Sequence, residues 1–225
     1  MSAVFFRKKI IWVSVVLLSC FICVGVYLYT QYLDRATVEA VSQNYYFLVA
    51  DTTHVEAGAM QVVLDGGAGY ILELEEGDFV TISVYTSKED AENVQKNLQN
   101  DTSLISLSVE NLYFKSEQEK KSAKKIVGAF HTLSDCIELL SNEISRMEKG
   151  GTQESCKRIL ETLKNQFVYL GKEYGSIFPA YEEVCEKTAN SLQELINDIV
   201  FVSDLRNLQC DLCYSYVRLA EDFSL

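Results

Sequence analysis

An uncharged apolar run near the amino terminus constrains this chain more than any other feature of its sequence. Ile10 to Tyr29 comprises twenty residues without an acidic residue, a basic residue or a proline. A helix that rises about 1.5 Å per residue would make this run about 30 Å long, which matches the hydrocarbon core of a bilayer. The sequence therefore predicts one transmembrane helix, with membrane contact through residues 10–32.

The charges that flank this run predict its orientation. A basic cluster, Arg7–Lys9, precedes the run, and only Arg35 lies close behind it. The positive-inside rule then places the amino terminus in the cytoplasm and everything after about Leu33 outside it. A cleaved signal peptide would have a shorter apolar core and a small-residue exit site, and a lipoprotein signal at Leu17–Cys20 would be followed by polar residues. We therefore expect a single-pass protein of the cell membrane whose later domains are extracytoplasmic.

Charge and pattern divide the chain into blocks. The net charge of −12 argues against nucleic acid as a partner, and it is unevenly spread. The first block is basic, the second is strongly acidic and the third is weakly acidic. We expect a cytoplasmic tip and transmembrane helix over 1–33, a linker over 34–44, a small α/β domain over 45–114 and a helical bundle over 115–225.

The 45–114 block predicts the order β-α-β-β-α-β. Alternating or β-rich runs mark four strands, at 45–49, 70–75, 79–84 and 105–109. The first helix follows Thr53-x-x-Glu56, which has the form of a capping box, and the second follows Ser87-x-x-Asp90. The fold class expected is α+β, with a ferredoxin-like four-stranded antiparallel sheet and both helices on one face.

This block also resembles a known family. A helix that ends in Gly66-Gly67-Ala68-Gly69-Tyr70, and a strand that runs into Tyr85–Ala91 (YTSKEDA), are similar to the SPOR domains of bacterial envelope proteins. The resemblance implies binding of peptidoglycan glycan strands that lack stem peptides, by a domain carried on a single-pass anchor. Leu48 departs from the polar residue usual in the first strand of that family, and Thr81 departs from the usual Arg or Gln. Another ferredoxin-like module is the alternative.

Strand alternation separates two faces of the expected sheet. We assign the more apolar set to the face under the two helices: Phe47, Val49, Leu72, Leu74, Val80, Ile82, Val84, Leu107 and Val109. The other face would be open for glycan, with Tyr46 as a platform for sugar rings and hydroxyl side chains as hydrogen-bonding groups. A solvated face, or one covered by the third block, is the alternative. The candidate glycan-binding residues are Tyr46, Leu48, Asp51, Glu73, Thr81, Ser83, Ser106 and Ser108.

The 115–225 block predicts a coiled-coil-like bundle of antiparallel helices. Three apolar seams step alternately by four and three residues, between Ile126 and Met147, between Cys156 and Tyr174, and between Tyr181 and Val202. Short breaks between them favour antiparallel neighbours. A fourth helix is expected from about Ser203. We expect this bundle to fold without the sheet.

Motifs for catalysis or metal binding are weak. Cys210 and Cys213 form a Cys-x-x-Cys pair, but it lies within an apolar helical pattern rather than at a helix start, where redox motifs lie. A zinc site would need two further ligands, and the available thiols of Cys136, Cys156 and Cys185 fall on or beside core seams. We expect no catalytic residues, no metal and no cofactor.

Two functions remain open from the sequence. The first is an envelope protein that binds peptidoglycan glycan strands, at a division or sporulation septum as the SPOR resemblance implies. The second is a non-enzymatic scaffold that has lost glycan binding and recruits an envelope protein partner through residues 115–225.

Overall fold

The middle of the chain forms a four-stranded antiparallel sheet with strand order β2-β3-β1-β4. The computed structural model describes residues 24–25, 37–52, 54–98 and 101–224. The expected order of two helices and four strands, and the antiparallel sheet, are confirmed. The elements of this part are β1 (Thr37–Ala50), α2 (Val55–Leu64), β2 (Tyr70–Leu74), β3 (Gly77–Tyr85), α3 (Lys88–Asn97) and β4 (Thr102–Phe114).

The first strand is much longer than its sequence pattern predicts. β1 begins at Thr37, which pairs with Phe114, and continues along nearly all of β4. Residues 37–44, expected to be part of a linker, are therefore strand. The pairing shifts between Ala40 and Gln43, and a bulge of this kind breaks the strict alternation on which strand prediction depends.

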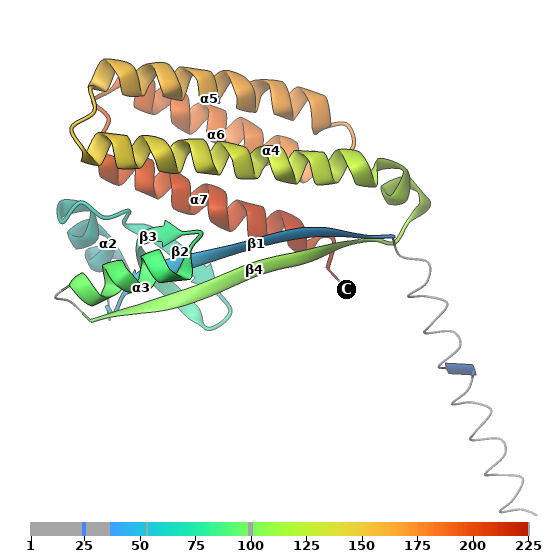
Figure 1. The fold of residues 1–225 in the computed structure, drawn as a ribbon, viewed down its shortest axis with the longest axis horizontal. Helices are drawn as coiled ribbons and strands as arrows, with labels where there is room; N and C mark the ends of the chain where they lie inside the picture. Colours follow the sequence, from blue (N-terminus) through green and yellow to red (C-terminus); the bar gives the residue numbers. More distant parts are fainter. Residues whose placement is uncertain (1–23, 26–36, 53, 99–100, 225) are drawn as a thin grey trace, which may run out of the picture.

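Four helices follow, and they stack in two layers on one face of the sheet. Figure 1 shows α4 and α7 against the sheet, α5 and α6 beyond them, and α2 and α3 on the opposite face. Both expected helices thus share a face, but the other face is covered rather than open. The bundle helices are α4 (Glu117–Glu148), α5 (Gln153–Tyr174), α6 (Pro179–Asn197) and α7 (Val202–Glu221).

The apolar seams of the bundle are largely confirmed. From Ile126 to Ile144 and from Cys156 to Leu170, every predicted seam position is buried. The third seam is buried from Tyr181 to Leu192, but Ile199 falls in the loop after α6 and is exposed. The fourth helix, α7, begins at Val202 and buries each of its predicted apolar positions.

The sheet and the bundle share one core. Tyr45 of β1 packs edge-on against Tyr216 of α7, with ring centroids 5.5 Å apart. Phe130 of α4 contacts Tyr216 in the same way at 5.0 Å, and the ring of Phe223 lies 5.3 Å from that of Phe114 on β4. The block boundary near residue 115 is therefore a boundary in sequence but not in packing.

Our assignment of residues to the faces of the sheet is wrong for five of the nine residues that we expected under α2 and α3. Residues expected under α2 and α3 belong instead to the buried cluster that includes α4 and α7; they are Phe47, Val49, Leu72, Val84 and Val109. The α2 and α3 layer buries only Val62 and Ala91 of its own side chains. The larger apolar face of the sheet packs against the larger apolar layer, because that arrangement removes more apolar area from water.

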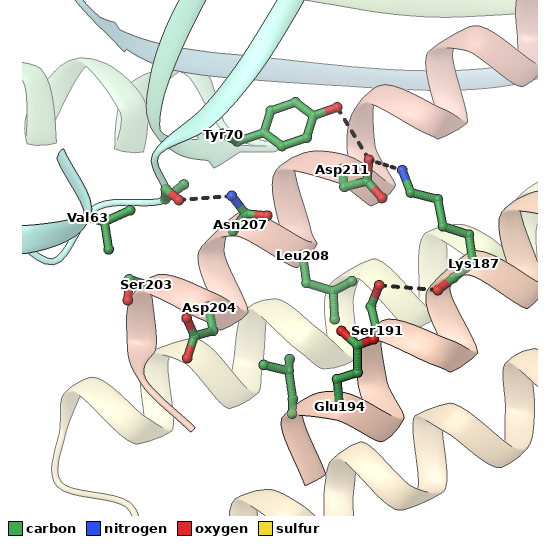
Figure 2. A pocket seen from close by; sticks show the side chains of 12 residues that line it. Val63, Tyr70, Lys187, Ser191, Glu194, Ser203, Asp204, Asn207, Leu208 and Asp211 are labelled. Carbon is green, nitrogen blue, oxygen red and sulfur yellow. Dashed lines mark hydrogen bonds and ion pairs between the residues drawn. The ribbon is translucent and has the colours of Figure 1, made fainter. Parts of the chain in front are cut away.

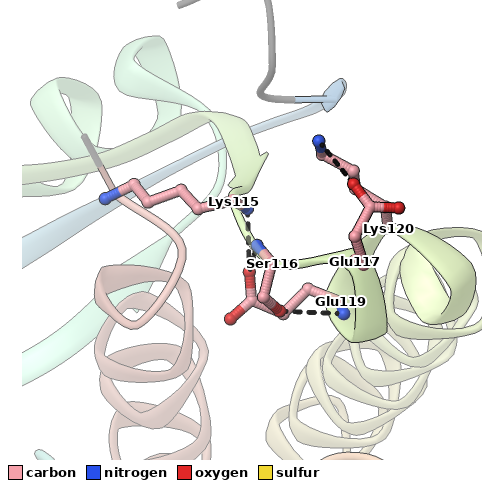
Figure 3. A network of polar contacts seen from close by, with 5 residues as sticks. All are labelled: Lys115, Ser116, Glu117, Glu119 and Lys120. Carbon is pink, nitrogen blue, oxygen red and sulfur yellow. Dashed lines mark hydrogen bonds and ion pairs between the residues drawn. The ribbon is translucent and has the colours of Figure 1, made fainter. Parts of the chain in front are cut away.

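The turn from sheet to bundle is fixed by a capping box (Figure 3). The carboxylate Oε2 of Glu119 accepts hydrogen bonds from the backbone N–H groups of Lys115 and Ser116, at 2.8 and 2.9 Å. The Ser116 hydroxyl in turn accepts from the backbone N–H of Glu119 at 3.1 Å. These bonds, first of all the one from the Ser116 backbone, lower the pKa of Glu119. They start α4 directly after β4 and so hold the bundle against the sheet.

The structure leaves the membrane prediction open. No helix within the described ranges is long and apolar enough to cross a bilayer. The predicted span, Ile10–Tyr29, lies outside those ranges except for Val24 and Gly25, so the transmembrane helix stays a prediction.

Candidate functional site

The predicted glycan-binding face does not exist as an open surface. Leu48 and Thr81 are fully buried, and Ser83 is nearly so. The Ser83 hydroxyl donates a hydrogen bond to the Tyr85 hydroxyl at 2.9 Å. Three of the eight candidate residues therefore face protein and are closed to a polymer.

The other five candidates do not converge on one site. Tyr46 lies opposite Ser106 in the β1–β4 pairing, while Glu73 is on β2 at the far edge of the sheet. Ser108 is exposed on the outer strand β4, and Asp51 is exposed just after β1. Tyr46 is half-buried. What remains is a narrow polar strip of Tyr46, Ser106 and Ser108, separate from the others.

Asp51 instead lines a small acidic cleft at the end of the sheet. The cleft holds about 260 Å³ and also includes the carboxylates of Asp78 and Asp101. The backbone N–H of Asp51 donates to the Asp101 carbonyl at 3.1 Å, which holds the two segments together. Among the described residues no group of His, Cys, Asp and Glu side chains is arranged to hold a metal ion.

A larger cleft lies where the α2–β2 loop meets α6 and α7 (Figure 2). It encloses about 450 Å³. Asp211 of α7 lines it, and the Asp211 Oδ1 accepts a hydrogen bond from the Tyr70 hydroxyl at 3.4 Å and pairs with the Lys187 Nζ at 2.7 Å. Burial raises the pKa of Tyr70, and the carboxylate of Asp211 adds to that shift. Tyr70 is therefore a neutral donor at physiological pH, and the triad joins β2, α6 and α7.

The loop of this cleft takes its shape from glycine. Gly66 and Gly69 have φ angles of 85° and 61°, a region that side chains with a Cβ rarely adopt. The bend exposes carbonyl oxygens to α7, where the Arg206 guanidinium donates to Gly66 and the Asn207 amide donates to Ala68. The glycine run that carried the family resemblance thus holds the loop on the bundle.

A third cleft is the most polar of those described and was missed from sequence. It encloses about 540 Å³ between the bulge of β1, the end of β3, α4 and α7. Nine of its ten lining residues carry a hydroxyl, amide or carboxylate: Ser42, Gln43, Asn44, Thr86, Ser134, Glu138, Ser141, Asn142 and Gln209. The polar run 42–44 was visible in the sequence but was assigned to the linker, and nothing in sequence placed it beside α4.

The five described cysteines are core residues. Cys136, Cys156, Cys185, Cys210 and Cys213 are all buried and free. Burial raises the pKa of the Cys136, Cys156 and Cys185 thiols to about 12, and it raises those of Cys210 and Cys213 as well. A reactive thiol needs the opposite shift and access to solvent. The interpretation of these residues as small apolar side chains fits these surroundings.

The structure therefore offers two larger surfaces for recognition, the polar cleft beside α4 and the cleft between α2 and α7. Comparison of this chain with protein-family models, with curated proteins and with solved structures finds no match.

Proposed function

We propose that this chain is a membrane-anchored, extracytoplasmic scaffold that binds a protein partner and has no catalytic activity of its own. One observation carries the proposal: both faces of the sheet are covered, and Leu48, Thr81 and Ser83 are buried. Three of the residues through which the SPOR resemblance implies glycan binding are therefore closed to a polymer, which favours the scaffold. The anchor rests on the uncharged run Ile10–Tyr29 and the basic residues before it.

The shared core also supports a scaffold. A protein that holds a partner at a fixed position benefits from a rigid body, and here the rings of Tyr45, Phe130 and Tyr216 join sheet and bundle in one cluster. Such a body would bind a partner through its ends and edges as one rigid unit, rather than as two domains that move relative to one another.

Two measurements test this proposal with the full-length chain. A reporter that is active only in the cytoplasm, fused after Leu225, should be silent. Extraction of membranes in mild detergent should yield the chain in a discrete complex larger than the purified chain alone. Strong reporter activity, or migration of the extracted chain only at its own size, would refute the scaffold.

Glycan binding is the second candidate function, with the binding site in the polar cleft beside α4 instead of on the sheet face. Neutral hydroxyl and amide groups such as Asn44 and Asn142 suit sugar hydroxyls. Each neutral hydrogen bond contributes only about 0.5–1.5 kcal/mol net, so binding would rest on several contacts. If this candidate is right, the chain pellets with peptide-free sacculi, Asn44→Ala and Asn142→Ala release it, and Ser106→Ala on the sheet strip does not. Failure of the wild-type chain to pellet would exclude it.

A further inference from the structure

Helix α2 exposes the kind of side chain that helices normally bury. Its ten residues, VEAGAMQVVL, include only two polar side chains, and Val62 is its one buried residue. Met60 and Leu64 are 71% and 75% exposed, and Val63 is also exposed. A surface helix usually turns its apolar stripe to the core and its polar face to water. Here apolar side chains at i, i+3 and i+4 face outward.

A second set of exposed apolar side chains lies on the other side of the cleft between the α2–β2 loop, α6 and α7. Val63 and Leu195 line this cleft together, and so does Ser203 at the start of α7. The loop 198–201 joins the α6 and α7 ends of the cleft and exposes Ile199 and Phe201. We call Met60, Val63, Leu64, Ile199 and Phe201, with the cleft between them, the distal surface. Exposed apolar side chains that flank a cleft in this way favour an interaction site.

The distal surface is bordered by acidic groups. The one cation that lines the cleft, Lys187, is paired with Asp211, and Arg206, which is nearby on α7, is paired with Glu148. The carboxylates that line the cleft or flank it in sequence outnumber them; they are Glu56, Asp65, Glu194, Asp198, Asp204 and Asp211. A partner that complements this surface must therefore combine apolar side chains with positive charge.

The position of the distal surface argues against a lipid occupant. In Figure 1, α2 and the α6–α7 loop lie at one end of the molecule, and the start of β1 lies at the other. β1 has 14 residues, which at about 3.3 Å per residue extend about 45 Å. With an anchor before Thr37, the surface would point away from the membrane, and its carboxylates would repel anionic headgroups.

We propose that the distal surface binds an amphipathic, lysine- or arginine-rich helix of a partner protein. The apolar face of that helix would lie across α2 and the α6–α7 loop, and its cations would face the acidic border, as in other helix-in-groove complexes. The inference rests on the proposed scaffold function and names the partner chemistry of the surface it uses.

The test uses the full-length chain in nanodiscs of zwitterionic lipid and synthetic helical peptides as probes. The first peptide has about 18 residues, five turns of helix, with leucine on one face and lysine on the other. A second replaces each lysine with glutamate, and a third scrambles the order of the first. Fluorescence anisotropy should report micromolar binding of the first peptide and weaker binding, by about tenfold or more, of the other two.

Variants locate the binding site. Met60→Ser with Leu64→Ser should weaken the lysine peptide about tenfold, because apolar anchors dominate such interfaces. Glu56→Gln with Glu194→Gln should weaken it less and should reduce its salt dependence. The matched control is Val168→Ser with Tyr169→Ser, which removes exposed apolar side chains from α5 instead, and it should change nothing.

Three results with the peptides or with the purified chain would overturn the inference. The first is that the glutamate peptide binds as tightly as the lysine peptide, and the second is that the α5 control weakens binding as much as Met60→Ser with Leu64→Ser does. The third is that the chain associates with itself and that Met60→Ser with Leu64→Ser abolishes this association, because a second copy would then occupy the surface. Persistence of the native membrane complex in that double variant would refute the distal surface and leave the scaffold standing. Absence of any native complex in the wild type would instead refute the scaffold.

Discussion

The two faces of the sheet are buried by layers of very different depth. On one face, α4 and α7 pack large rings such as Phe130 and Tyr216 against Tyr45 and Phe47, and α5 and α6 seal that layer from water. On the other face, α2 and α3 together bury two side chains, one of them alanine. The bundle thus forms one core together with the sheet, whereas α2 and α3 bury little of their own surface against it.

This difference decides which surfaces are free to bind. The deep layer closes its own face of the sheet to a polymer, and the polar groups at its margin lie around Asn44 and Gln209. The thin layer leaves α2 with more apolar surface outside than inside. A βαββαβ unit that is open in isolation becomes, with the bundle added, a unit that can act only through its ends and edges.

The largest expected effect comes from removing the sheet. A fragment of residues 115–225 loses Tyr45, Phe47, Leu112 and Phe114, which pack in the same cluster as α4 and α7. The sequence led us to expect an independent bundle, but the shared core predicts a fragment with fluctuating packing. Far-ultraviolet circular dichroism should stay helical, near-ultraviolet signal should be lost, and a hydrophobic dye should bind. A sharp, cooperative thermal transition in the fragment would show that the deep layer does not need the sheet.

The second largest expected effect is a loss of stability of the deep layer at alkaline pH. All five described cysteines lie in the bundle, and burial raises the pKa of each thiol, to about 12 for Cys136, Cys156 and Cys185. Above about pH 9 the unfolded chain loses these protons and the folded chain keeps them, so the free energy of unfolding falls as pH rises. Each group contributes a slope of about 1.4 kcal/mol per pH unit.

Urea unfolding at pH 7, 9 and 10 would measure this loss. The double variant Cys210→Ala with Cys213→Ala should show a shallower decline, because two of the buried thiols are gone. A free energy of unfolding that stays constant over this range would mean that the thiols are accessible in the folded chain, in conflict with their burial.

Periodicity predicted the elements well because it reports how a segment is buried. The seams from Ile126 to Ile144 and from Cys156 to Leu170 repeat at the spacing of a helix face, and both are buried as expected. The strands around Tyr45–Val49 and Phe79–Val84 were found for the same reason. The bulge between Ala40 and Gln43 hid the first half of β1, because there the alternation is interrupted.

What the sequence could not reveal is which layer covers which face. Alternation separates Phe47 and Val49 from Leu48, but it carries no information on the segment that packs against each set. The candidate site depended on that assignment, and so Leu48, Thr81 and Ser83 were placed in solvent when they are buried. The triad joins Tyr70 to Lys187 and Asp211, which are more than a hundred positions away from it in the sequence, and no local pattern marks it.

Single truncations should rank the two layers directly. Phe130→Ala removes a ring that contacts Phe178, Tyr216 and Phe223, and it should cost about 3–5 kcal/mol. Val62→Ala in α2 removes two buried methyl groups, at about 0.8 kcal/mol each, and should cost about 1–2 kcal/mol. Equal losses in urea unfolding would mean that the α2 layer carries more of the core than its burial indicates.

The smallest expected effect is on the outer side of α2. Met60→Ser and Leu64→Ser should each change the free energy of unfolding by no more than about 0.5 kcal/mol relative to the wild-type chain. Neither side chain is buried, and surface substitutions away from special features are nearly neutral. Serine lowers helix propensity by only a fraction of a kcal/mol, which sets the sign of any residual loss. A loss above about 2 kcal/mol, well outside that surface range, would show that these side chains are buried in solution. If that loss grew with protein concentration, the burying surface would be a second copy of the chain, and the thin layer would be completed by self-association rather than by a basic partner.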